Sequence, residues 1–166
     1  MRILLAIDGS KHSAEAVKTV ARRPWPSSSV IRVLNAFVVP MSPPAPVGDL
    51  GWTSSDIEVL RGENKKASEK LVLRVANSLG KGKIKVERVV REGDPATVIV
   101  EEAKEWRADL IVVGSHGYTG LKRLVLGSVA QSVVAHAPCS VEVVRRKESG
   151  RAAKAAGGQV PARKTE

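Results

Sequence analysis

The stretch "ADLIVVGSHGYTGLKRLVLGSV", residues 108–129, decides the fold of this chain. It begins with an apolar run ending at Gly114, which is typical of a strand buried on both faces of a sheet. Gly114, Gly117 and Gly127 then follow the spacing G-x2-G-x9-G, with Ser128 directly after. Glycine weakens a helix or strand interior by roughly 0.5–1 kcal/mol relative to alanine. The cluster therefore predicts a backbone that bends sharply or lies close to another group.

Strands and helices alternate along the rest of the chain. We expect strands at residues 2–7, 30–39, 83–90, 108–114 and 140–145. We expect helices at residues 11–23, from about 54 to 79, from 95 onward, and from about 128 to 136. Alternation of this kind predicts a parallel sheet with right-handed crossovers and with helices on both faces.

The helices carry start signals and apolar faces. Ser10 and Asp94 are the predicted N-caps of the first and third helices, and Pro95 suits the first helical position. The predicted buried face of the first helix consists of Ala14, Val17 and Ala21. The predicted stripe of the second helix consists of Ile57, Leu60, Asn64, Ala67, Leu71, Val75 and Leu79. We expect His12 and His136 on helix surfaces.

Composition indicates one domain followed by a basic tail. The chain has 166 residues, of which 43% are hydrophobic and 27% charged, as in soluble globular proteins. Half of the net charge of +10 falls on the 22 residues from Arg145 onward. We expect residues 1–146 to form the domain and residues 147–166 to be disordered. The tail is either a solvated extension or a weak, salt-dependent anchor for a polyanion, although no nucleic-acid motif accompanies it.

The single cysteine and the lengths of the apolar runs indicate in which cellular compartment the protein resides. Cys139 is alone, so no disulfide forms within the chain, and we expect it to be a small buried apolar residue. No apolar run approaches the roughly 20 residues of a membrane helix, and the first apolar run is too short for a signal peptide. These features predict a cytoplasmic protein without membrane contact.

Two strand ends carry the candidate site. In open α/β sheets, ligands bind beyond the carboxyl ends of the strands where the strand order reverses. Asp8 and Gly9 follow the first strand, and residues 114–117 follow the fourth. Gly127 and Ser128 then begin a helix, whose free N–H groups and dipole favour anions. The pattern predicts phosphate binding, with glycines that serve only turn geometry as the alternative, and it is neither a Walker A loop nor a dinucleotide fingerprint.

Single side chains have competing interpretations. Asp8 either contacts a ligand or Mg²⁺ or only caps the first helix, and His116 either donates to phosphate or is a loop residue. Lys122 and Arg123 either reach a triphosphate or stay in solvent. The proline-rich loop at residues 40–52, which ends with Trp52, is a candidate lid over the site.

Three segments resemble the universal stress protein family over about residues 1–146. They are "ILLAIDGSKHSAEA", "GDPATVIVEEAKEWRADLIVVG" and "VVGSHGYTGLKRLVLGSVAQSVVAHAPCSVEVVR". The spacing G-x2-G-x9-G-S is the pattern of the ATP-binding branch of that family. The resemblance implies an α/β fold of Rossmann-like type: a three-layer α/β/α sandwich with a five-stranded parallel sheet in the order 3-2-1-4-5.

The resemblance also implies a nucleotide-binding set. Adenine would meet Ala6, Ile7 and the backbone of Ala36, the ribose would pass Val113 and Gly114, and the phosphates would meet His116, Gly117, Gly127, Ser128, Val129 and Ala130. Asp8 would lie near the ribose and the metal-bridged phosphates, where it would contact Mg²⁺ directly or through water. Because Mg²⁺ takes few protein carboxylates and several phosphate oxygens, no dedicated protein metal site is expected. Family members often carry Thr or Ser where Ala130 stands, so one side-chain contact to phosphate is expected to be missing.

The implied function is ATP-dependent regulation of a stress response, with no catalytic residues assigned. A slow Mg²⁺-dependent ATPase or phosphotransferase using Asp8 and His116 is one alternative, and an interaction module working through the basic tail is another. The family tends to dimerise through its last strand, here Val141–Val144, which would cover an exposed sheet edge.

Overall fold

The computed structural model describes residues 1–39, 54–80, 84–117 and 126–145. They contain a five-stranded, all-parallel sheet in the order β3-β2-β1-β4-β5. The strands are β1 (Arg2–Ala6), β2 (Val30–Phe37), β3 (Lys85–Glu92), β4 (Leu110–Gly114) and β5 (Ser140–Val144). The helices are α1 (Lys11–Arg22), α2 (Ser54–Leu79), α3 (Pro95–Trp106) and α4 (Ser128–His136). The expected fold class and strand order are therefore confirmed.

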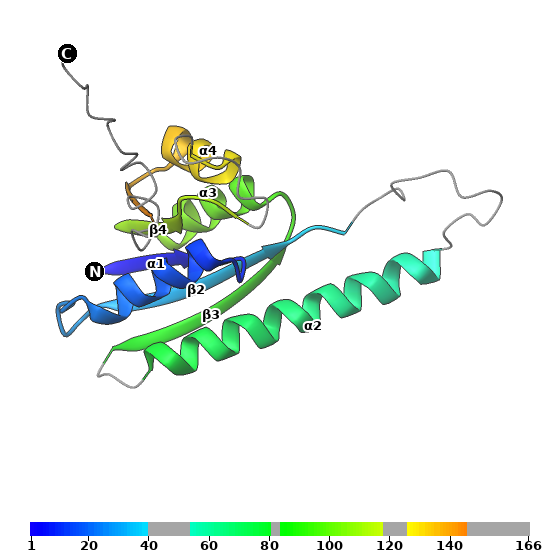
Figure 1. Cartoon of the computed structure of the whole chain (residues 1–166), viewed down its shortest axis with the longest axis horizontal. Helices are drawn as coiled ribbons and strands as arrows, with labels where there is room; N and C mark the ends of the chain where they lie inside the picture. The colour runs from blue at the N-terminus through cyan, green and yellow to red at the C-terminus, as the bar shows by residue number, and fades with distance from the viewer. Residues whose placement is uncertain (40–53, 81–83, 118–125, 146–166) are drawn as a thin grey trace, which may run out of the picture.

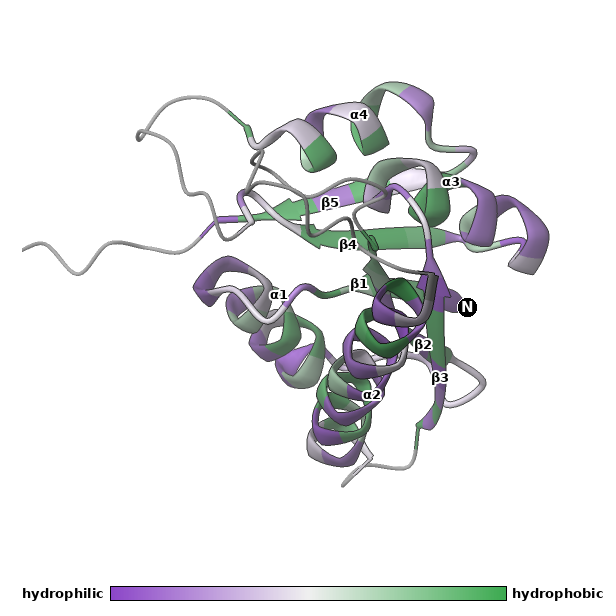
Figure 2. Cartoon of the chain, turned by 90° about the vertical axis from the view of Figure 1, so that its right-hand side faces the viewer, coloured by the Kyte–Doolittle hydropathy of each residue, from purple (hydrophilic) through white to green (hydrophobic). Residues whose placement is uncertain are grey.

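The sheet is the middle of three layers. Figure 2 shows α1 and α2 on one side of the strands and α3 and α4 on the other. Side chains of β1 alternate between the two cores: Ile3 and Leu5 pack with α1 and α2, whereas Leu4 packs with α3 and α4. Because β1 is central and covered on both faces, its sequence is a continuous apolar run rather than an alternation.

The buried face of α1 is shifted by one position along the sequence from the predicted one, although Val17 of the predicted face is half-buried against the same core. The buried residues are Ser13, Ala16 and Val20, while Ala14 and Ala21 are exposed. Ser10 caps the helix as predicted, because its hydroxyl accepts a hydrogen bond from the Ser13 N–H at 3.1 Å. The face is set instead by contact with β4, on which the first turn of α1 rests. Periodicity gives the spacing of the buried positions but not which face is buried. The predicted and observed faces are related by a rotation of about 100° around the helix axis.

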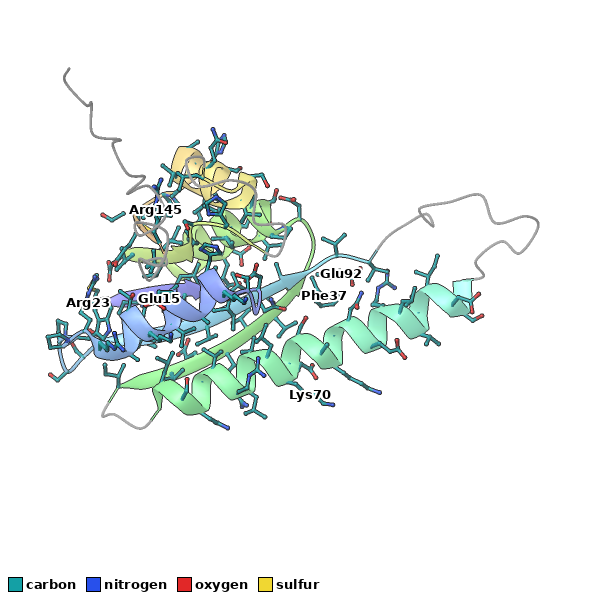
Figure 3. All side chains as sticks on the ribbon, in the orientation of Figure 1. Glu15, Arg23, Phe37, Lys70, Glu92 and Arg145 are labelled. Atoms are coloured by element: carbon teal, nitrogen blue, oxygen red, sulfur yellow. The ribbon has the colours of Figure 1, made fainter. Side chains whose placement is uncertain are left out.

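The buried face of α2 also differs in part. Ser68, Val72, Ala76 and Leu79 are buried, whereas Ala67 of the predicted stripe is exposed. Lys70 points away from the sheet, as Figure 3 shows. The helix packs on β2 and β3, and Leu71 and Val75 of the predicted stripe are half-buried against the same core. The buried face is therefore centred one position further along the sequence than predicted.

The first two turns of α2 extend past the sheet. The Asn64 side chain donates to the Val38 carbonyl at 3.4 Å, and Arg61 pairs with Glu92 at 3.0 Å. Phe37 and Glu92 lie side by side at the carboxyl ends of β2 and β3 (Figure 3). Residues before Arg61 therefore project beyond that edge, where Figure 1 shows the start of the helix.

A charged network joins β2, β3 and α3. Arg32 lies 2.6 Å from Glu87 and 2.7 Å from Glu102, and its guanidinium stacks 4.2 Å above the Trp106 ring. Glu102 is only 3% exposed and also accepts from Arg91 at 3.1 Å. Hydrogen bonds from Lys85 and Arg32 hold the pKa of Glu87 below its usual range. The buried carboxylate of Glu102 is tolerated because Arg32 pairs with one of its oxygens and Arg91 with the other.

Several expectations fall outside the described residues. These are the candidate lid at residues 40–52, the side chains of Lys122 and Arg123, and the basic tail at residues 147–166. Among the helices of the described ranges, none is long and apolar enough to cross a bilayer.

Candidate functional site

A crevice of about 1110 Å³ lies at the carboxyl ends of β1, β2 and β4. It occupies the point where the chain leaves the sheet to one side after β1 and to the other after β4. The structure brings to its walls all twelve residues that the family resemblance implies: Ala6, Ile7, Asp8, Ala36, Val113, Gly114, His116, Gly117, Gly127, Ser128, Val129 and Ala130.

The loop after β1 presents one carboxylate oxygen of Asp8. The other oxygen, Oδ1, accepts a hydrogen bond from the Ser10 N–H at 2.9 Å, which closes a tight turn. Gly9 has φ of +86°, a left-handed conformation that favours glycine. Ser10, rather than Asp8, caps α1. Within the described part of the chain, Oδ2 of Asp8 has no hydrogen-bond partner, so it is available to a ligand.

The loop after β4 is clamped from both sides. The Ser115 N–H donates to the Val144 carbonyl at 2.9 Å, and the Ser115 carbonyl accepts from the Gly127 N–H at 2.8 Å. The Ser10 hydroxyl donates to the His116 carbonyl at 3.4 Å. The starts of α1 and α4 are thus both tied to Ser115 and His116, so these parts of the two loops form one wall.

The three motif glycines have different neighbours. A Cβ on Gly114 would lie 2.8 Å from the carbonyl carbon of His12 and from the Ser13 nitrogen. A Cβ on Gly127 would lie 3.2 Å from the His116 Cα, and one on Gly117 would lie 2.9 Å from Oδ2 of Asp8. Gly114 is therefore required for the packing of α1 on β4. Gly117 is the glycine whose substitution would disturb Oδ2 of Asp8.

Helix α4 begins without a side-chain cap. Its N-cap is Gly127, whereas the N-caps of α1 and α3, Ser10 and Asp94, each accept a hydrogen bond from a first-turn N–H. The first N–H groups of an α-helix have no partner within the helix, and the helix dipole adds partial positive charge there. Ser128, Val129 and Ala130 line the crevice, so this uncapped end faces it. An anion would satisfy these groups.

A buried hydroxyl connects two histidines beside the crevice. Oγ of Ser115 lies 3.3 Å from Nδ1 of His12 and 3.1 Å from Nδ1 of His116. The two rings are 5.1 Å apart between centroids. His12 was expected on a helix surface, but it is half-buried against the loop after β4. Nε2 of His116 is buried and has no hydrogen-bond partner among the described residues.

Sequence reasoning missed the α2 wall of the crevice. Ser68, Leu71 and Arg74 line it, and Arg74 has no ion pair among the described residues. Leu71 belonged to the predicted stripe, but its spacing could not show which part of the sheet it would cover. Asn35 was also missed. Its side chain is buried and donates to the Ile7 carbonyl at 2.6 Å, which joins β2 to the end of β1.

Other polar groups lie outside the site. Cys139 precedes β5, at the opposite end of the strands, and packs against the core under α3 and α4. Burial raises the pKa of its thiol, with a further contribution from Asp109, so the thiol stays protonated. The described residues contain no group of three or more His, Cys, Asp or Glu side chains placed to hold a metal ion.

Comparison with known proteins gives consistent matches. A sequence model described as the universal stress protein family matches residues 1–145. Universal stress protein MJ0531 of Methanocaldococcus jannaschii is 36% identical over 145 residues, covering 87% of this chain and 82% of the relative. Universal stress protein YxiE of Bacillus subtilis is 33% identical over 147 residues, covering 87% and 98%.

Solved structures have the same architecture. The hypothetical protein MJ0577 is 25% identical, has a TM-score of 0.76, and covers 89% of this chain and 97% of its own. A universal stress protein family member from Arabidopsis thaliana with AMP bound has a TM-score of 0.64 at 23% identity, covering 89% and 92%. A universal stress protein in complex with cAMP has a TM-score of 0.55 at 22% identity, covering 87% and 96%.

Proposed function

The chain belongs to the universal stress protein family, and from that membership we propose that it binds ATP with Mg²⁺ in the crevice and acts as a nucleotide-dependent regulator in the cytoplasm. The AMP and cAMP bound by two structural neighbours support an adenine nucleotide as the ligand.

One observation carries the proposal: the uncapped N-terminus of α4 opens onto a crevice that is also lined by Asp8, whose Oδ2 has no hydrogen-bond partner among the described residues. Unpaired N–H groups and the helix dipole both favour phosphate oxygens at this end. The absence of a side chain at Gly127 leaves these donors to a ligand. The cap position that stabilises α1 and α3 from within the chain would here be occupied by phosphate.

The rest of the wall suits an adenosine group. Ala6, Ile7, Ala36 and Val113 provide an apolar surface at the ends of the three strands. Ligand sites are mostly apolar, with a few polar groups that fix orientation. Strand ends also leave backbone N–H and C=O groups for the base edge, so adenine binding needs no specialised side chain.

Asp8 would face the phosphates, and two negative groups repel each other at short range. A Mg²⁺ ion, which takes one or two carboxylates together with phosphate oxygens, removes that repulsion. Oδ2 of Asp8 is the candidate contact, direct or through water. When bound, the ion neutralises phosphate charge, and Asp8 orients it.

Binding is favoured over turnover. Phosphoryl transfer needs a positioned base and donors that stabilise charge in the transition state. The described part of the α4 cradle, residues 114–117 and 126–130, contains no lysine or arginine. The cationic side chain among the described lining residues is Arg74, which comes from α2 rather than from the cradle. The arrangement resembles a holder of nucleotide, whose occupancy a partner would read.

The test uses a charge placed at the start of α4. Ser128→Asp puts a carboxylate at the first helical position, where it stabilises the helix but repels phosphate. Ser128 is exposed, so the fold should tolerate the change. We expect the Kd for Mg-ATP, measured by isothermal titration calorimetry, to rise at least about tenfold, the factor that corresponds to 1.4 kcal/mol.

The matched control is Gln131→Asp, an exposed position one turn further along α4. It adds the same charge away from the first-turn N–H groups, so the Kd should change by less than about twofold, because the dipole effect is confined to the first turn. Equal affinity of both variants and the wild type would contradict the α4 site. Purified protein that neither carries nor binds an adenine nucleotide would contradict the function.

A further inference from the structure

The hydroxyl of Ser115 joins two imidazoles from distant parts of the chain. His12 belongs to α1 and His116 to the loop after β4, and each Nδ1 lies within hydrogen-bond distance of Oγ, at 3.3 and 3.1 Å. Ser115 is 1% exposed, so water does not replace these contacts. Gly114 makes the arrangement possible, because a Cβ there would collide with the His12 backbone at 2.8 Å.

A single hydroxyl proton couples the two rings. Serine has one O–H donor, and a neutral imidazole has one N–H and one bare nitrogen. If Oγ–H donates to Nδ1 of one histidine, then Nδ1 of the other must carry its proton and donate to Oγ. The two neutral rings then take opposite tautomers, and changing one changes the other. If both Nδ1–H groups donated to Oγ instead, the buried hydroxyl proton would have no acceptor among the described residues.

Only one of the two arrangements suits an anion. When His12 donates from Nδ1 to Ser115, the Ser115 hydroxyl donates to Nδ1 of His116, and Nε2 of His116 carries a proton. In the reverse arrangement Nε2 of His116 is a bare acceptor and would repel a phosphate oxygen. Nε2 of His116 is buried without a partner in the part of the chain that the structure describes. A buried unpaired donor costs about 1–3 kcal/mol, which a phosphate oxygen would offset.

We propose that His12 is a positioning residue: through the Ser115 hydroxyl it holds His116 in the tautomer that donates from Nε2 to a phosphate group in the crevice. This inference rests on the proposed nucleotide site, since His116 lines the same crevice. His12 itself does not touch the ligand. Its effect reaches the site through two hydrogen bonds.

The experiment combines a tautomer measurement with binding. Proton–nitrogen correlation NMR on ¹⁵N-histidine protein distinguishes protonation at Nδ1 from protonation at Nε2 in each ring, with or without ligand. We expect Nε2–H for His116 and Nδ1–H for His12 in the wild type at a pH where both rings are neutral. In His12→Leu, Ser115 loses its donor, His116 should become a mixture of tautomers, and the Kd for Mg-ATP should rise about five- to tenfold.

Two further variants separate the relay from packing. His12→Asn keeps an N–H donor near Oγ, so both the His116 tautomer and the Kd should stay within about twofold of the wild type. His136→Leu changes an exposed histidine on α4 and should alter neither measurement. Ser115→Ala removes the bridge itself and should reproduce the effect of His12→Leu.

The outcomes are distinguishable. An unchanged His116 tautomer in both His12→Leu and Ser115→Ala would overturn the relay, even if ATP binds. A switched tautomer with an unchanged Kd would overturn the role of His116 in holding phosphate. Wild-type protein that does not bind ATP would contradict the proposed function, and the tautomer of His116 in the ligand-free variants would still decide the relay.

Discussion

Two glycines show how much depends on what surrounds a residue. Gly114 ends β4 beneath α1, where a Cβ would lie 2.8 Å from backbone atoms of His12 and Ser13. Gly62 lies within α2 and has nothing within 4 Å of its Cβ position. Both look like weak points of a regular element in the sequence. Only Gly114 is required by the packing of the fold.

We expect opposite effects of alanine at these two positions. Gly114→Ala should lower the free energy of unfolding by about 1–3 kcal/mol, because neither backbone segment can move aside without shifting α1. Gly62→Ala should raise it by about 0.5–1 kcal/mol, since alanine loses less backbone entropy in a helix. Urea denaturation followed by circular dichroism measures both. A Gly114→Ala variant as stable as the wild type would refute the close contact between α1 and β4.

At the scale of elements, capping distinguishes the helices that support the fold from the helix that faces the crevice. Asp94 caps α3 with its own carboxylate, which accepts from the Thr97 N–H at 2.9 Å. This hydrogen bond, followed by the one from the Thr97 hydroxyl, lowers the pKa of Asp94. α4 has no such internal partner. The chain thus stabilises α3 by itself and leaves the start of α4 to a ligand.

The Asp94 cap predicts a dependence of stability on pH. A lowered folded-state pKa means that the stabilisation is present above the unfolded-state pKa of about 3.9 and is lost as pH falls through the folded value. Asp94→Ala should cost about 1 kcal/mol at pH 7, and the difference from wild type should shrink below about pH 4. Denaturation curves from pH 3 to 7 measure this. Asp94→Asn retains a cap that does not titrate, so its stability relative to Asp94→Ala should not vary with pH. A loss in Asp94→Ala relative to the wild type that stays the same from pH 7 to pH 3 would contradict the assignment.

At the scale of the whole molecule, the two edges of the described sheet differ. β3 carries Lys85, Glu87, Arg88, Arg91 and Glu92, and charged side chains protect an edge from pairing with another chain. β5 carries one charged residue, Glu142, which both terminal nitrogens of Arg23 hold at 2.7 and 2.9 Å. The β5 edge is therefore the better candidate for association with a second copy.

We expect the protein to form a dimer through β5. Light scattering coupled to size-exclusion chromatography should give twice the mass of the chain. Amide exchange on the free edge of β5 should slow as protein concentration rises, because a partner strand would hydrogen-bond those groups. The outer amides of β3 are the internal control and should not respond to concentration. A monomeric mass, or protection confined to β3, would contradict pairing at β5.

Most of the elements, and the strand ends that line the crevice, could be predicted from the sequence because those signals are local. Pro95 after Asp94 marks the start of α3, and the apolar runs at β1 and β4 mark strands covered on both faces. Resemblance to a known family supplied the strand order. With that order, the loops after β1 and β4 had to meet at one edge, as the structure confirms.

The tertiary structure alone decided which faces and groups meet. Periodicity did not select Ser13, Ala16 and Val20 over the neighbouring face of α1, because the direction of a helix face depends on the segment beneath it. Nor could any local pattern bring His12 to Ser115, 103 positions along the chain, or show that Gly114 serves helix packing. Neighbours along the chain set a residue's backbone conformation, whereas the packing of helices on the sheet determines which groups its side chain contacts.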